Sequence, residues 1–185
     1  MNRFTLAGLF LAATLPVAHA DVFEQDILGT PYVDMAVGTA GFEESSVKAT
    51  GYQLTLGTFL TPNFGIEGTF KMAQATENAS YTLDYGVTCS NAKLRHAMLG
   101  GGLVGRISPL EKLSLTARGG YSLTHKSVDC ANQTSYSSSA RSGLYVGVGV
   151  GYQFAQNWMA ELRHDRNNGP FDSHLTSLGL SYTIR

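Results

Sequence analysis

The chain has little charge, and it lacks a long apolar run beyond its first residues. Charged residues make up 15% of its 185 residues, against roughly 25% in ordinary globular domains. Its formal net charge of −1 gives no overall excess of basic residues, so nucleic acid, which requires a basic face, is not an expected partner. No stretch after residue 20 reaches the roughly 20 apolar residues of a helical membrane span. This composition leaves two classes, a soluble β protein or a membrane β-barrel.

The first twenty residues have the three parts of a secretory signal peptide. Arg3 supplies a positive charge, Phe4–Leu15 is an apolar core, and Ala18-His19-Ala20 has the small-x-small pattern of a cleavage site. We therefore expect residues 1–20 to be a cleaved signal peptide and residues 21–30 to be a short lead-in. Without Arg3, 12 basic residues remain against 14 acidic ones.

Residues 31–185 are expected to form one all-β domain, because apolar residues alternate there with small or polar ones. In Leu144–Phe154, Leu, Val and aromatic residues fall on one face, and mainly glycine falls on the other. Period-two alternation is typical of strands, and each segment is near the 9–11 residues of a tilted membrane strand. Eight segments are predicted: Pro31–Gly41, Lys48–Leu60, Phe64–Thr76, Lys93–Ile107, Leu113–Leu123, Leu144–Phe154, Trp158–Asp165 and one ending in Leu178–Ile184.

Short and long connections alternate between these segments. The short ones are Thr61–Asn63, Ser108–Lys112 and Ala155–Asn157. The longer, polar ones are Phe42–Val47, Glu77–Ala92, Ser127–Ala140 and Arg166–Ser173. Outer-membrane barrels have short periplasmic turns and longer extracellular loops. The order predicts an eight-stranded antiparallel up-and-down transmembrane β-barrel.

The two faces of the strands favour a membrane barrel over a soluble one. The polar face is largely Gly, Ser and Thr, which suits the narrow interior of an eight-stranded barrel, whereas a soluble barrel would carry many charges outside. Aromatic residues are predicted at the tight-turn rim, where they would form an interfacial girdle: Phe64, Phe154, Trp158 and Tyr182. We therefore expect the bacterial outer membrane as the location.

Isolated charges fall on the inward face near mid-strand. Strand parity places seven of them in the lumen: Asp34, Glu67, Lys71, Arg106, Arg118, Glu161 and Arg163. Because an unpaired buried charge costs several kcal/mol, these residues predict a salt-bridge network that plugs the barrel. The alternative is a narrow, gated ion path lined by the same residues.

The pattern of residues 31–185 resembles the OmpA-like small outer-membrane β-barrels. The likeness rests on the glycine-interleaved strand Tyr145–Tyr152 and the closing Ser177–Tyr182. The resemblance implies the membrane-barrel fold. Members of this family include membrane anchors, adhesins, serum-resistance factors and several enzymes.

The chain has two cysteines, Cys89 and Cys130, one in each of two expected long loops. Both would lie at the outer rim, in a compartment where disulfides persist. We predict a disulfide that joins these loops and stabilises the fold by about 2–4 kcal/mol.

The segment around His164 has one possible catalytic reading. It resembles the His-x-Ser-Asn segment of the outer-membrane lipid A deacylases, with His164 as the base and Asn167 as the Asn. Arg166 stands at the nucleophile position, and Leu178 stands where the orienting Glu is expected. A base without its nucleophile cannot form an acyl intermediate, so no catalytic residues are predicted.

No cofactor or metal site is predicted either. Four residues near the same loop are possible metal ligands, but they lack the fixed spacing of known metal sites: His164, Asp165, Asp172 and His174. The expected function is non-enzymatic, with loops on a rigid barrel displayed for adhesion, colonisation or envelope integrity. The expected partners are outer-membrane lipid, lipopolysaccharide and a host or surface ligand, with the protein a monomer. The alternatives are a lipid A-modifying enzyme and a narrow pore.

Overall fold

The computed structural model describes residues 29–42, 45–77, 81–82, 88–89, 92–130, 136–137, 140–168 and 172–184. The expected signal peptide, and the lead-in up to residue 28, lie outside these residues. The described part contains no helix that is long and apolar enough to cross a membrane.

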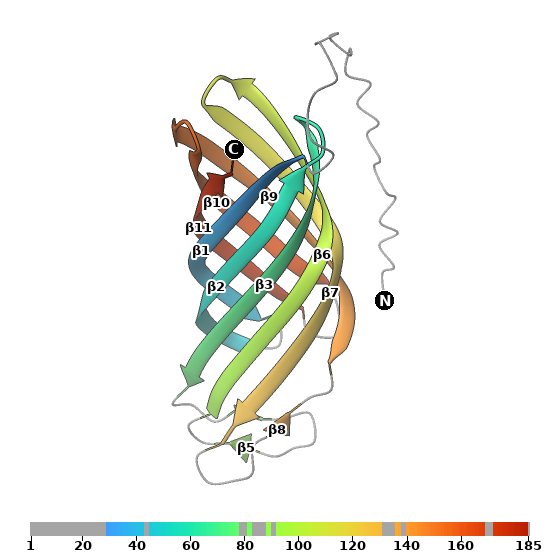
Figure 1. The fold of residues 1–185 in the computed structure, drawn as a ribbon. Helices are drawn as coiled ribbons and strands as arrows, with labels where there is room; N and C mark the ends of the chain where they lie inside the picture. Colours follow the sequence, from blue (N-terminus) through green and yellow to red (C-terminus); the bar gives the residue numbers. More distant parts are fainter. Residues whose placement is uncertain are drawn as a thin grey trace, which may run out of the picture.

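Eight long antiparallel strands form a closed barrel (Figure 1). They are β1 (Thr30–Phe42), β2 (Ser45–Phe59), β3 (Phe64–Glu77), β6 (Ala92–Leu110), β7 (Leu113–Asp129), β9 (Arg141–Ala155), β10 (Trp158–Asn168) and β11 (Ser173–Thr183). There are also three two-residue strands: β4 (Tyr81–Thr82) pairs with β5 (Thr88–Cys89), and β8 (Tyr136–Ser137) pairs with the end of β7.

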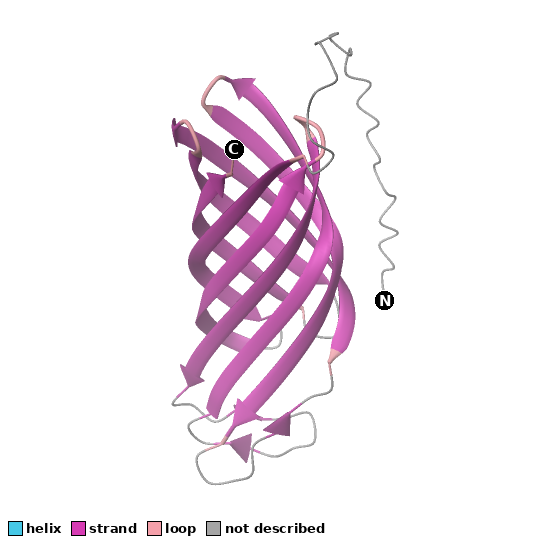
Figure 2. Cartoon of the chain, viewed as in Figure 1, coloured by secondary structure: helices cyan, strands magenta, loops and turns pink. Residues whose placement is uncertain are grey.

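Each long strand pairs with its neighbours along the chain, and β1 pairs with β11 to close the sheet. The closing ladder runs from Tyr32 opposite Thr183 to Phe42 opposite Ser173. Closure matters because an open sheet edge would leave unpaired N–H and C=O groups, which lipid cannot satisfy. The sequence prediction of an eight-stranded up-and-down barrel is confirmed (Figure 2).

Three tight turns lie at one rim, at the top of Figure 1. In the first, the Thr61 hydroxyl accepts hydrogen bonds from the backbone N–H groups of Asn63 (3.3 Å) and Phe64 (3.0 Å). The turn expected at 108–112 is shorter than predicted, because β6 continues to Leu110. The register shifts between Ile107 and Leu110, an irregularity that accommodates Pro109, which has no N–H to donate.

The other rim differs more from the sequence prediction. β6 has 19 residues and β7 has 17, which is longer than the segments predicted there, because their ladders continue past the apolar band, whereas β10 and β11 have 11 residues each. In β6 and β7 pairing extends to Lys93 opposite Asp129. Only residues 43–44 separate β1 from β2, and 169–172 separate β10 from β11. Two of the four expected long loops are therefore short, and the long ones are 78–91 and 130–140.

Alternation along each strand divides apolar from polar residues as predicted. On the outer face of β11, starting from the loop-side rim, His174 and Thr176 are followed by the exposed Leu178, Leu180 and Tyr182. The order is polar, then apolar, then aromatic, which is the arrangement expected across half a bilayer and its interface.

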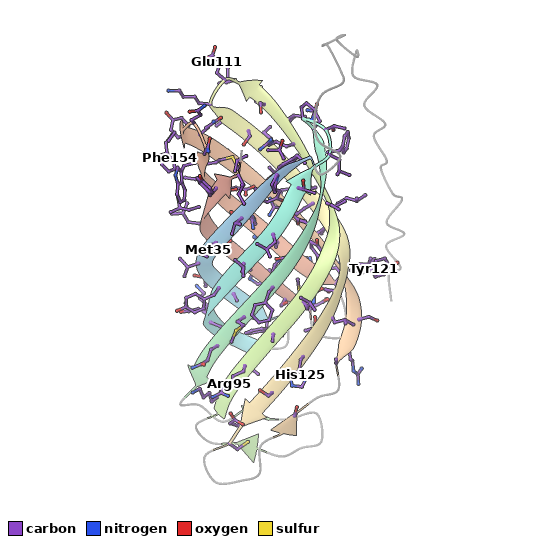
Figure 3. The ribbon with its side chains drawn as sticks, in the orientation of Figure 1. Met35, Arg95, Glu111, Tyr121, His125 and Phe154 are labelled. Atoms are coloured by element: carbon purple, nitrogen blue, oxygen red, sulfur yellow. The ribbon has the colours of Figure 1, made fainter. Side chains whose placement is uncertain are left out.

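Aromatic residues gather on the outer face near the turns. The four predicted girdle residues are all exposed: Phe64, Phe154, Trp158 and Tyr182. The Trp158 and Tyr182 rings contact each other with centroids 4.8 Å apart, and Figure 3 shows Phe154 pointing outward near this rim.

Small inward residues make room for the larger ones in the narrow lumen. A Cβ added at Gly147 would overlap the Asp165 carboxylate, and one at Gly149 would overlap Glu161. In contrast, a Cβ at the outward Gly68 would meet only a backbone oxygen 3.9 Å away. Glycine is therefore required where β9 faces the charged side chains of β10.

A charge placed in the middle of the apolar band should destabilise the barrel. We expect Leu178→Arg to lower the free energy of unfolding in lipid vesicles by about 2–4 kcal/mol, and His174→Arg at the rim of the same strand by about 0–1 kcal/mol. Denaturant titrations of vesicle-inserted protein would measure both. Equal losses for the two variants would contradict the assigned position of the band.

Candidate functional site

The barrel interior holds a cluster of charged side chains. Six of the seven predicted residues are buried in it, each with at most 9% of its surface exposed: Asp34, Glu67, Lys71, Arg118, Glu161 and Arg163. They come from β1, β3, β7 and β10, and parity alone turns each of them inward.

Glu161 connects two arginines at the centre of this cluster. Its Oε1 accepts from Arg118 Nη2 at 3.0 Å, and its Oε2 accepts from Arg163 Nη2 at 2.5 Å. The Thr116 hydroxyl also donates to Oε1. Both carboxylate oxygens of Glu161 are thus bonded, and one acidic residue ties β7 to β10 through the lumen.

The two arginines extend the cluster to other strands. Arg163 Nη1 lies 3.0 Å from Asp34 Oδ1 on β1. Arg118 Nε lies 4.0 Å from Glu67 Oε1 on β3. Glu67 also accepts hydrogen bonds from the hydroxyls of Tyr32 (2.9 Å) and Tyr145 (3.4 Å). Four strands that are distant along the chain therefore share one polar network.

Asp165 is a member of the network that the sequence analysis did not place there. It is 1% exposed, and its Oδ2 lies 2.7 Å from Lys71 Nζ. With the Gln53 amide nitrogen oriented toward Asp165 Oδ2 (3.0 Å), the amide oxygen accepts from Arg163 Nη1 at 2.7 Å, which joins this pair to the rest. The signal was present, because Asp165 follows Glu161 and Arg163 in steps of two.

Arg106 lies apart from the network, contrary to the sequence prediction. Its guanidinium stacks over the Phe59 ring, 3.9 Å from the centroid. Arg106 lies two residues nearer the tight-turn rim than Val104, which packs with Tyr32 and Phe59 in a buried apolar layer. Parity gave the correct face of β6 but not the height along the barrel, and no described carboxylate forms an ion pair with Arg106.

A second apolar layer lies on the loop side of the network. Its buried members are Ala40, Phe42, Ala49, Ala73, Ala75, Leu94, Val128 and Leu175, and the half-buried Cys130 packs against them. A cavity of about 30 Å³ adjoins Lys71, His96 and Asp165, a space of the size of one or two waters. Charged residues thus fill the middle of the lumen between two apolar layers.

The structure separates the residues of the possible catalytic segment. His164 is on the outer face, where its Nδ1 lies 2.8 Å from the Thr176 hydroxyl. Asn167 is inside, bonded to Ser122 (2.7 Å) and Thr124 (3.1 Å). An odd spacing in a strand puts two residues on opposite faces, so the base and the asparagine do not meet.

The possible metal ligands near this loop are also divided between the inner and outer faces of the barrel wall. The His164 and His174 rings lie on the outside with centroids 6.1 Å apart, while Asp165 points inward to Lys71. Across the described ranges, no group of three or more His, Cys, Asp or Glu side chains has the arrangement of a metal site.

The predicted disulfide falls partly outside the described residues. Cys130 follows β7 directly and is half-buried, and no described cysteine is a free thiol. The side chain of Cys89 is not among those described, so its pairing with Cys130 stays a prediction.

Basic residues gather on the outside at the loop-side rim. We call five of them the basic collar: Lys48, Lys93, Arg95, His125 and His174. They belong to β2, β6, β7 and β11, and Figure 3 shows Arg95 and His125 near the end of the barrel that carries β5 and β8. The acids described at this level are Asp129, 3.9 Å from Arg95, and Asp172. Its three lysine and arginine side chains make it a cationic surface on a chain whose overall charge is −1.

Removing the central carboxylate should cost far more than removing an exposed one. Glu161→Gln leaves the buried guanidiniums of Arg118 and Arg163 with less negative charge beside them, and breaking such a pair costs about 3–5 kcal/mol. Glu111→Gln, at the exposed turn shown in Figure 3, should change stability by less than about 0.5 kcal/mol. Unfolding of the two variants in lipid vesicles measures the difference, and matching midpoints would refute the central role of Glu161.

Comparison with solved structures places the barrel among outer-membrane proteins. The chain is similar to Ail, the attachment invasion locus protein of Yersinia pestis, with 16% identity and a TM-score of 0.55 over 84% of this chain and 97% of that one. It is also similar to Neisserial surface protein A, with 16% identity and a TM-score of 0.60 over 84% and 96%. The N-terminal β-barrel domain of Pseudomonas aeruginosa OprF gives 14% identity and a TM-score of 0.54 over 83% and 97%.

At such identities these likenesses show the fold. A comparison with curated proteins gives no match. The model of the outer membrane protein beta-barrel domain matches residues 7–183. The chain therefore belongs to the outer membrane protein beta-barrel domain family, and it is a protein of the bacterial outer membrane.

Proposed function

We propose that this protein is a non-enzymatic surface protein that uses its loop-side rim to bind anionic surface molecules. The observation that carries the proposal is the basic collar, which lies between the apolar band and the two long loops. Loops are the usual place of recognition on a rigid scaffold. By the general orientation of such barrels, this rim faces the outside of the cell.

The charges of the collar define the chemical class of the ligand. Lys48 on β2 and Arg95 on β6 are exposed on the outer face of the barrel, and His174 is exposed on β11. Cationic side chains at this height would meet the phosphates of lipopolysaccharide in the outer leaflet, or sulfates and carboxylates of a polysaccharide that approaches from outside. The shared feature is a dense array of negative charges.

The similar proteins point the same way. Ail is named for attachment and invasion, and one of its structures contains sucrose octasulfate, a heparin analogue. A second similar protein is named a surface protein. These names support adhesion as the role of this chain, with the collar as the part that contacts the anion.

Filling of the lumen makes transport a weaker proposal than surface binding. The network around Glu161 occupies the middle of the lumen, and apolar layers around Phe42 and Phe59 lie on either side of it. Ions that passed through would have to displace paired buried charges, each of which costs several kcal/mol to leave alone. We infer a plugged barrel.

The plugged barrel predicts the absence of large conductance. In planar bilayers, inserted protein should give no steps of the size of an open, water-filled pore, because its paired side chains fill the lumen. A wide porin in the same bilayer verifies the assay, and heat-modifiable migration on a gel verifies folding. Large single-channel steps would overturn the plug and favour the narrow-pore alternative.

Collar charges should determine binding to anionic polymers. We expect folded protein to bind immobilised heparin and lipopolysaccharide at low salt, and we expect the binding to weaken as salt rises. Arg95→Gln should weaken binding several-fold, and the triple change of Lys48, Lys93 and Arg95 to Gln at least tenfold. Lys112→Gln, which removes one charge at the opposite rim, is the matched control.

The two probes separate the possible sources of the anion. If the collar variants lose binding to heparin alone, the natural ligand is more consistent with an external polysaccharide. If they lose binding to lipopolysaccharide alone, it is more consistent with lipopolysaccharide of the outer leaflet. Equal binding by the collar variants, the Lys112 variant and the parent protein would reject the proposal.

A further inference from the structure

An open cavity of about 760 Å³ occupies the mouth of the barrel at the tight-turn rim. It lies at the end that carries Glu111 in Figure 3, opposite the basic collar. Pockets that bind small molecules typically have volumes of about 300–1,000 Å³. The cavity is therefore large enough for a small ligand, and by the usual orientation of such barrels it opens to the periplasm.

Arg106 lines this cavity and is held in a fixed place. Its backbone N–H donates to the Asn63 carbonyl oxygen at 2.8 Å, and its own carbonyl oxygen accepts from Asn63 Nδ2 at 2.8 Å. Its guanidinium stacks on the ring of Phe59, which is 8% exposed. Both the strand position and the plane of the guanidinium are thus defined before any ligand arrives.

The guanidinium of Arg106 lacks a carboxylate partner within the described part of the chain. The other lumen arginines, Arg118 and Arg163, have carboxylate oxygens within 4.0 Å. No ion pair joins Arg106 to a described acid, and its guanidinium lies over Phe59, which forms a buried apolar cluster with Tyr32 and Val104. Arg106 therefore presents donors toward the cavity rather than toward the plug.

The rest of the cavity wall combines apolar surface with polar groups. The side chains of Phe59 and Met159 supply apolar surface, and Ser114 and Gln153 supply hydroxyl and amide groups. At the mouth, Glu111 and Lys112 offset each other in charge. The net positive group that remains is Arg106, whose planar fork matches the geometry of a carboxylate.

We propose that this cavity binds a small carboxylate with an apolar body. The carboxylate accepts two hydrogen bonds from Arg106, and the apolar body contacts Met159 and Phe59. Such a ligand is either a free organic acid or the C-terminal carboxylate of a short periplasmic peptide, because both present the same group. This site is distinct from the collar and does not depend on the surface-binding function.

Isothermal titration calorimetry reports directly on occupancy of the cavity. The experiment titrates the mature protein in bilayer nanodiscs with 3-phenylpropionate and with N-acetyl-alanyl-alanine. The primary amide of each compound is the neutral control of nearly the same shape. We expect a saturable heat of binding with at least one acid and at least tenfold weaker binding of the matching amide.

Variants test whether Arg106 holds the carboxylate. Arg106→Gln should weaken binding of the acid at least tenfold, because a hydrogen-bonded charge pair contributes about 1.5–3 kcal/mol. Arg106→Lys keeps the charge but loses the fork and should bind the acid several-fold more weakly than the parent. Arg95→Gln removes one positive charge at the far rim and should bind within twofold of the parent.

The outcomes separate the two ligand sources and the two rims. Binding of phenylpropionate alone indicates a free organic acid, and binding of the dipeptide alone indicates a peptide terminus. Equal binding of acid and amide, no saturable response with either acid, or unchanged affinity in both Arg106 variants would overturn the proposal.

Heparin binding by the same Arg106 variants should equal that of the parent, so failure of the carboxylate proposal leaves the collar proposal unaffected. Heat-modifiable migration confirms that each variant is folded, and the acid–amide comparison in the parent decides if Arg106→Gln does not fold.

Discussion

Backbone hydrogen bonding in lipid is the constraint on which the rest of this structure depends. Because hydrocarbon offers no partner for an N–H or C=O group, a spanning sheet must close on itself, and here β1 and β11 complete the circle. Closure with eight strands leaves an interior just wide enough for side chains. Every inward residue must then fit beside its neighbours, which explains the glycines of β9 opposite Glu161 and Asp165.

The narrow interior also determines how the charges are arranged. A buried ion pair adds little net stability by itself, because desolvation offsets the attraction, but an unpaired buried charge is costly. Glu161 therefore bonds to both Arg118 and Arg163, and Asp165 bonds to Lys71. The pairs connect β1, β3, β7 and β10, so the network favours one register of the closed sheet over any slipped one. We regard it as a specificity device as much as a source of stability.

The two ends of the barrel have different chemistry. At the loop side, strands continue past the apolar band and present the basic collar outside a lumen closed by alanines and Phe42. At the turn side, the strands are joined tightly, and a cavity with Arg106 on its wall remains open. In the plugged barrel that we propose, the network separates these ends, and a ligand at one end would have no path to the other through the lumen. Binding at the basic collar and binding at the turn-side cavity can therefore be studied separately, and a variant can lose one without losing the other.

The sequence by itself determined the number of strands, the faces of their residues and the aromatic girdle, because period-two alternation is a local property of extended backbone. The same parity turned Glu161 and Arg163 inward, and it applies equally to Asp165, the last residue of the expected strand Trp158–Asp165, which was nevertheless not predicted to be in the lumen. Parity says nothing about height along the barrel, which depends on the stagger between paired strands. Only the tertiary structure decided that Glu161 meets Arg118, 43 residues away, and that Arg106 lies beyond the Phe59 layer. It also decided where the strands end, since pairing at the loop-side rim continues as long as both partners reach it, as Lys93 and Asp129 do.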